Sequence, residues 1–212
     1  MINYNTKSFF TQYVKQFGKF NEQQKDGLKF LLNKLSLSKR IPLLRMRAYV
    51  LATVRFETAY TYEPITEYGS EKYLKSKPYY PYIGRGYIQL SWKSNYEKFG
   101  GALNIDLVGN PKLANEPETA WKILEMGMTD NFGVQDPDFT NYTLEDFFKR
   151  YQQFQDFYRA RKIINPKDYD SYEPIAQMAE GFVKCLSASE IEEANNSAAP
   201  RGLEEVKWNI TK

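Results

Sequence analysis

The sequence contains no histidine, and Cys185 is its only cysteine. A single cysteine cannot form a disulfide within the chain, and a zinc site built from His and Cys is excluded. The lack of histidine also excludes Ser-His-Asp and Cys-His catalysis. We expect no metal or other cofactor, so any proton transfer falls to Asp, Glu, Lys or Tyr. The apolar neighbours of Cys185 predict that it is a buried core residue.

Long apolar runs are also lacking, and no stretch approaches the length of a membrane span. The first residues do not show the basic and then apolar pattern of a signal peptide. The formal net charge of +3 is small, and no basic cluster alternates with aromatic residues as in nucleic-acid-binding proteins. We expect a monomer without a nucleic-acid partner, made in the cytoplasm. Its mild positive charge suits an anionic partner such as a bacterial cell wall.

The residues that are present predict one mainly α domain. A chain of 212 residues suffices for one well-packed core, and 42% of its residues are apolar. Apolar side chains recur at helical spacing through most of the chain. We predict a core over about residues 20–186 and a polar, loosely docked tail over 187–212. Helices are expected over residues 8–17, 21–35, 42–57, 95–103, 115–128, 143–158 and 172–186.

The periodicity is interrupted over residues 60–86, a segment rich in Tyr, Pro and Gly. We predict a long active-site loop there, followed by a short strand over residues 87–91. Glu57 stands at the end of the preceding helix, which is apolar on more than one face. A partly buried carboxylate has a raised pKa, as a general acid requires, although a surface Glu at a helix end is the alternative.

Five short motifs resemble those of glycoside hydrolase family 19, which contains plant and bacterial chitinases and many phage endolysins. The resemblance covers roughly residues 20–186, and its most specific part is the Gly-Arg-Gly-x-Ile-Gln-Leu-x-Trp block. It implies a lysozyme-like, α-rich fold with at most a small β element. The motifs are Glu57-Thr58-Ala59, Glu67-Tyr68-Gly69, residues 82–92 with Asn95-Tyr96, residues 105–111, and Ile163-Ile164-Asn165.

The resemblance implies two catalytic carboxylates. Glu57 matches the general acid of the family. Glu67 is our choice for the general base if the following loop has one extra residue, and Glu63 and Glu71 are the alternatives. For Glu63 and Glu71 we favour a role as solvated loop charges. Ser91 is expected to help hold the nucleophilic water.

Further positions match family residues that contact sugar. These are Gln89, Asn95 and Asn165, whose alternative role is hydrogen bonding within strands or helix caps. Tyr87 and Trp92 are expected either to stack on sugar rings or to belong to the core.

The resemblance thus implies an inverting glycoside hydrolase that cuts β-1,4 bonds in a polymer containing N-acetylglucosamine. We favour peptidoglycan, cut by an endolysin released from the cytoplasm to the wall, over chitin. A lytic transglycosylase, which would not need Glu67, is one rival. An inactive glycan-binding or structural protein is the other, because Phe56 stands where the family usually has His. Arg85 is expected to hold the active-site loop.

Overall fold

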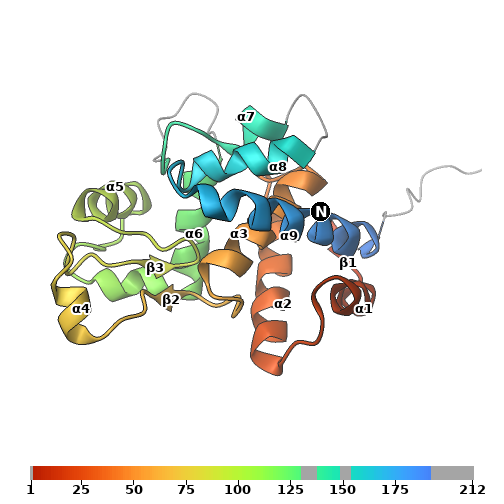
Figure 1. The fold of residues 1–212 in the computed structure, drawn as a ribbon, viewed down its shortest axis with the longest axis horizontal. Coiled ribbons are helices and arrows are strands. Elements are labelled where there is room, and N and C mark those ends of the chain that lie inside the picture. The colour runs from red at the N-terminus through yellow and green to blue at the C-terminus, as the bar shows by residue number, and fades with distance from the viewer. Residues whose placement is uncertain (1, 130–137, 149–153, 192–212) are drawn as a thin grey trace, which may run out of the picture.

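The computed structural model describes residues 2–129, 138–148 and 154–191, and it confirms a mainly α-helical chain (Figure 1). The helices are α1 Thr6–Phe17, α2 Glu22–Leu37, α3 Leu44–Glu57, α4 Glu71–Lys75, α5 Lys93–Leu103, α6 Pro117–Met128, α7 Leu144–Phe148, α8 Phe154–Ala160 and α9 Tyr172–Ser187. Three 3-10 turns, η1 Pro111–Asn115, η2 Arg161–Ile163 and η3 Tyr169–Ser171, connect them. The strands are β1 Asn3–Tyr4, β2 Ile65–Thr66, β3 Arg85–Gly86 and β4 Glu190–Ile191.

Helix α3 is the centre of the core. Every residue from Met46 to Val54 is buried, as expected for a helix that is apolar on more than one face. Its main neighbour is α9, which also packs against α1 and α8. Figure 1 shows α3 behind α9. In this view α4, α5 and the β2–β3 pair lie to the left of α3, and α1 lies to its right. The last residue of this buried helix, Glu57, therefore has a fixed position.

The starts of α2 and α6 differ in how they are capped. Asn21 and Gln24 form a capping box at the start of α2, with each side chain accepting from the other residue's backbone N–H. Helix α6 begins at Pro117, inside the predicted range 115–128, and no side chain caps it. The Asn115 side chain instead donates to Thr66 Oγ1 (2.6 Å) and accepts from the Gly86 N–H (2.9 Å). It thus connects both β2 and β3 to the residues before α6.

The small β element lies earlier than expected. Strands β2 and β3 pair antiparallel, with Ile65 opposite Gly86. The predicted strand over residues 87–91 is wrong, because residues 87–89 form a turn and Gln89 has a φ of +52°. Arg85 and Leu90 exchange two backbone hydrogen bonds across that turn. The short helix α4 within the long loop was not predicted.

The first and last described strands lie side by side. Strands β1 and β4 pair antiparallel, so residues 190–191 of the predicted tail join the fold, and residues 192–212 lie outside the described part. Cys185 is fully buried, as expected, and burial raises its pKa to about 12. The helix expected over 143–158 appears as α7 and α8, with residues 149–153 outside the description. No helix in the described ranges is both long and apolar enough to cross a membrane.

Two helical glycines give a test of this packing. A Cβ added at Gly27 in α2 would lie 2.6 Å from the Tyr62 backbone oxygen, whereas one added at Gly101 in α5 would meet nothing within 4 Å. We therefore expect Gly27→Ala to lower the free energy of unfolding. Gly101→Ala should raise it by about 0.5–1 kcal/mol, because alanine favours helices. Urea unfolding followed by circular dichroism measures both, and equal effects would contradict the close approach of α2 to Tyr62.

Candidate active site

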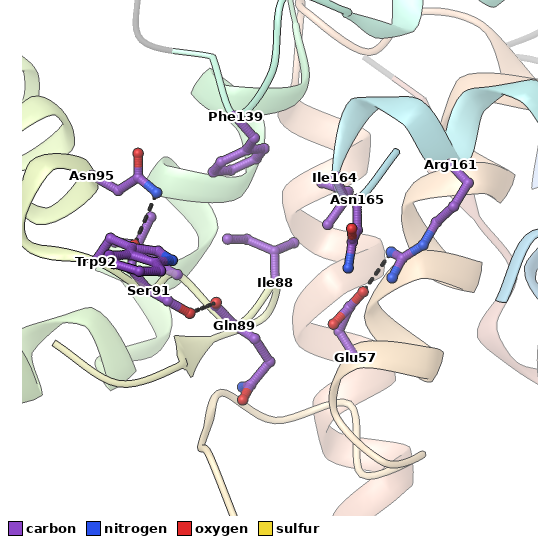
Figure 2. Close-up of a pocket in the computed structure, with 11 residues that line it drawn as sticks. Glu57, Ile88, Gln89, Ser91, Trp92, Asn95, Phe139, Arg161, Ile164 and Asn165 are labelled. Carbon is purple, nitrogen blue, oxygen red and sulfur yellow. Dashed lines mark hydrogen bonds and ion pairs between the residues drawn. The ribbon is translucent and has the colours of Figure 1, made fainter. Parts of the chain in front are cut away.

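Glu57 ends α3 with its carboxylate directed at an arginine from a distant part of the chain. The Arg161 Nη1 atom lies 2.5 Å from Glu57 Oε1. The Glu57 side chain is 12% exposed and that of Arg161 is 2% exposed, so water screens this pair poorly. Figure 2 shows both side chains reaching toward one another at one side of a pocket.

Arg161 begins η2, directly after α8, and has two more partners. Its Nε donates to Ser171 Oγ (2.6 Å), and its Nη2 lies 2.8 Å from Asp168 Oδ2. Both partners come from the segment that leads into α9. The sequence reasoning missed Arg161. It precedes Ile163-Ile164-Asn165 by two residues, but nothing local distinguishes it from Arg159 or Lys162 as the buried cation.

The surroundings of Glu57 raise its pKa. Burial is the largest cause, since it disfavours the charged form, and the negative charge of Asp168 acts in the same direction. The charge and hydrogen bond of Arg161 oppose this and do not cancel it. The position at the C-terminal end of α3 also disfavours an anion. For Asp168, burial raises the pKa, but the hydrogen bonds from Arg161 and Ser171 outweigh it and the net shift is downward.

The chain turns sharply after Glu57. Thr58 is fully buried, donates its hydroxyl to the Val54 carbonyl (2.7 Å) and accepts from the Tyr62 N–H (3.1 Å). Ala59, Tyr60 and Tyr62 all have left-handed φ angles, between +48° and +68°. Such a conformation costs energy in residues other than glycine and persists only where the surroundings impose it. The Thr58 hydrogen bonds provide that support directly beside Glu57.

A pocket of about 330 Å³ lies in front of Glu57. One side is formed by the turn after β3 and the start of α5, and the other by the end of α3 and η2 (Figure 2). Apolar side chains of Ile88, Leu90, Phe139 and Ile164 line it between these sides. Six of the eight predicted site residues line the pocket, namely Glu57, Gln89, Ser91, Trp92, Asn95 and Asn165.

The polar residues opposite Glu57 are held by bonds to backbone carbonyls. Gln89 Nε2 donates to Ile65 O (3.1 Å) and to Gly86 O (3.4 Å). Ser91 Oγ donates to Gln89 O (2.9 Å), and Asn95 Nδ2 donates to Ser91 O (2.9 Å). The alternative role of these residues in local hydrogen bonding is therefore present, and it coexists with a position on the pocket wall. Gln89 and Asn95 form these hydrogen bonds through the nitrogen of the side-chain amide. The amide oxygen of each side chain is an acceptor.

Glu67 is not among the residues that line the pocket. It follows β2, and its carboxylate accepts from the Tyr79 hydroxyl and from the Gly84 N–H, both at 3.0 Å. Glu63 accepts from Gln23 Nε2 of α2 (2.6 Å), and the largely exposed Glu71 pairs with Lys75 (2.6 Å). Both of these contacts suit the surface-charge roles that we favoured for Glu63 and Glu71.

The structure also shows the places of Tyr87, Trp92 and Arg85. Tyr87 is 2% exposed and its ring stacks near Phe30, so the core alternative is the one present. Trp92 is 51% exposed and lines the pocket. Arg85 holds the loop, as predicted, by donating to the Pro81 and Ile83 carbonyls and to the Tyr96 hydroxyl.

No group of three or more Asp, Glu, His or Cys side chains in the described ranges could hold a metal ion. The pocket offers instead one buried carboxylate with a raised pKa, one buried guanidinium and several amide and hydroxyl groups. Chemically, this set can donate a proton from Glu57 and form hydrogen bonds with a polar ligand.

Comparison with known proteins supports the resemblance drawn from the motifs. Residues 55–131 match the model of the glycoside hydrolase family 19 chitinases, described as chitinase class I. Rice chitinase 8 (Oryza sativa subsp. japonica) is 60% identical over 35 residues, which are 16% of this chain and 13% of that protein. An inactive chitinase-like protein 1 from Hevea brasiliensis is 46% identical over 50 residues, 21% of this chain and 16% of that protein.

A crystal structure of chitinase C from Streptomyces griseus HUT6037 has the same fold. Its TM-score is 0.53 and its sequence identity 24%, over 84% of this chain and 74% of that chain. The curated relatives are matched over less than a quarter of their lengths. The resemblance to family 19 is thus confirmed over residues 55–131, which include Glu57, Glu67 and the turn from Gln89 to Asn95 but not Arg161 or Asn165.

Two substitutions should move the pKa of Glu57 in opposite directions. Arg161→Met removes the cation that lowers it, so the pKa of Glu57 should rise further. Asp168→Asn removes an anion that raises it, so the pKa should fall. NMR titration of the Glu57 carboxyl carbon measures both shifts. A shift of the same sign in both variants would contradict the arrangement, and Glu71→Gln, an exposed change, serves as the control.

Proposed function

Because the segment around Glu57 matches family 19, we propose that this chain is an inverting glycoside hydrolase. Its substrate would be a β-1,4-linked polymer containing N-acetylglucosamine. The observation that carries the proposal is the buried Glu57 carboxyl, with its raised pKa, facing an open pocket. A general acid needs a proton to donate near neutral pH, and burial provides for this.

In the proposed reaction, Glu57 protonates the glycosidic oxygen of the leaving group. Arg161 does not touch the substrate in this scheme. It holds the Glu57 carboxyl in one orientation, and the charge of Asp168 offsets part of its acidifying effect. As the leaving group departs, the Glu57 carboxylate becomes charged, and the nearby guanidinium then stabilises it.

We assign the general base to Glu67. In an inverting enzyme the base activates a water on the opposite face of the sugar, with the two carboxyl groups roughly 6.5–9.5 Å apart. The Glu67 carboxylate is oriented by two hydrogen bonds, from Tyr79 and Gly84, while Glu63 and Glu71 are engaged elsewhere. Ser91 on the pocket wall would hold that water.

Sugar binding would use both sides of the pocket. Gln89 and Asn95 present amide groups on one side and Asn165 on the other, which suits the acetamido and hydroxyl groups of N-acetylglucosamine. Trp92 exposes half of its surface beside them and offers a face on which a sugar ring can stack.

For the polymer we propose peptidoglycan first and chitin second. The positive net charge favours an anionic wall polymer that the protein would reach after release from the cytoplasm. Chitin is supported by the relatives, several of which are named as chitinases. The inactive relative from Hevea and Phe56 beside Glu57 support a third outcome, a protein that binds glycan without cutting it.

Glu57→Gln should abolish reducing-end release from purified peptidoglycan and from chitin oligomers, by at least about 10²-fold, because glutamine has no proton to donate. Glutamine preserves the size of the side chain, so we expect the variant to stay folded, as thermal unfolding will show. Glu63→Gln is the matched control on the neighbouring loop. Full activity in the Glu57 variant would refute the general acid, and an inactive wild type would favour glycan binding alone.

Glu67→Gln should also remove hydrolysis, whereas Glu71→Gln should leave it close to the wild-type rate. Mass spectrometry of the products adds a second test, because hydrolysis adds water and a lytic transglycosylase forms an anhydro-sugar. Anhydro products together with an active Glu67→Gln variant would overturn the inverting mechanism. Loss of activity only in the Glu71 variant would move the base to Glu71.

A further inference from the structure

Trp92 and the loop beside it carry a group of exposed and half-exposed side chains that extends beyond the pocket. We call it the lysine–tyrosine ledge, and its members are Tyr73, Lys77, Tyr79 and Trp92. The Tyr79 and Trp92 rings are 5.2 Å apart between centroids, and the Lys77 Nζ atom lies 3.9 Å from the centroid of the Tyr73 ring. Tyr73 is 48% exposed and Trp92 is 51% exposed, so much of the ledge faces solvent.

The ledge is continuous with the pocket. Trp92 lines the pocket, contacts the Tyr79 ring and donates its backbone N–H to the Tyr82 carbonyl (2.9 Å). Tyr80 and Tyr82 in turn bond to the carbonyls of Lys77 and Tyr79. A polymer that leaves the pocket across Trp92 would therefore pass over Tyr79 toward Lys77.

Lys77 carries an available positive charge. Within the described residues it forms no ion pair, whereas Lys75 on the adjacent helix α4 is paired with Glu71 at 2.6 Å. The pKa of Lys77 is raised, chiefly by its interaction with Tyr73 and also by Tyr79 and Glu67, which keeps the ammonium charged. Glu67 is nearby, but its two oxygens already accept hydrogen bonds from Tyr79 and Gly84.

We propose that the lysine–tyrosine ledge binds a carboxylate-bearing part of the glycan, with Lys77 pairing with the carboxylate and the aromatic rings contacting the sugar next to it. This rests on the proposed function and makes it more specific, because chitin carries no carboxylates and peptidoglycan does. The cation–π contact with Tyr73 restrains the long Lys77 side chain, so less of its conformational freedom is lost on binding. Lys77 is thus a specificity-determining residue and takes no part in proton transfer.

The test measures binding in the Glu57→Gln background, so that no substrate is consumed. The probes are soluble peptidoglycan fragments without cross-links and the same fragments with their carboxyl groups converted to amides. We expect tighter binding of the carboxylate form, and Lys77→Gln should reduce this preference about two- to five-fold, the scale of an exposed ion pair. The preference should also decrease as salt is added.

Two further variants are controls. Lys77→Arg keeps the charge and should keep most of the preference, whereas Lys75→Gln removes a lysine that is already paired and should not change it. An equal preference with and without Lys77, or the same loss in the Lys75 variant, would overturn the proposal. Because binding is measured apart from cleavage, an inactive wild type would refute the hydrolase and still leave this result decisive for the ledge.

Discussion

The candidate site depends on one buried guanidinium. Arg161 joins the end of the central helix, at Glu57, to the segment that leads into α9, at Asp168 and Ser171. A buried cation is costly unless it is paired and hydrogen-bonded, and here its three nitrogens each have a partner. The same contacts that satisfy Arg161 fix the orientation of Glu57. One set of hydrogen bonds therefore both satisfies the buried guanidinium and positions the general acid.

The opposite side of the pocket is built on a different principle. Within the described residues, the buried ion pair at the pocket belongs to the Glu57 side. Arg85 donates to carbonyls of its own loop, and Gln89 donates to the carbonyls of Ile65 and Gly86. Asn115, just before α6, forms hydrogen bonds with both β2 and β3. Backbone groups in a long irregular loop need partners when they are removed from water, and side-chain amides and guanidinium groups supply them here. This explains how a segment with little regular structure can present fixed polar groups to a ligand.

The two sides also differ in their relation to known proteins. The segment that matches family 19 includes Glu57 and the pocket side that carries Gln89, Ser91 and Asn95. Arg161, Asn165 and Asp168 lie beyond this segment. The pocket is complete only when the shared segment meets residues that the family match does not cover. The lysine–tyrosine ledge is a third region, and its exposed rings and the Lys77 ammonium lie outside the buried network around Arg161.

Much of this protein follows from its sequence alone. The lack of histidine and the single cysteine leave proton transfer to Asp, Glu, Lys or Tyr. Helical periodicity predicts α1, α2, α3 and α9, because their apolar stripes recur every three to four residues. The position of Glu57 at the end of a buried helix follows in the same way. The family motifs predict which polar residues gather opposite it.

Other features were decided by tertiary structure. The turn at residues 87–89 replaced a predicted strand because Arg85 and Leu90 pair across it, and Tyr87 became a core residue. Arg161 could not be recognised, since its partner Glu57 is 104 residues away and a local sequence does not show which of several cations will be buried. Sequence patterns report which face of an element is apolar. Which charged groups meet across the pocket depends on how the elements pack, and only the folded chain determines that.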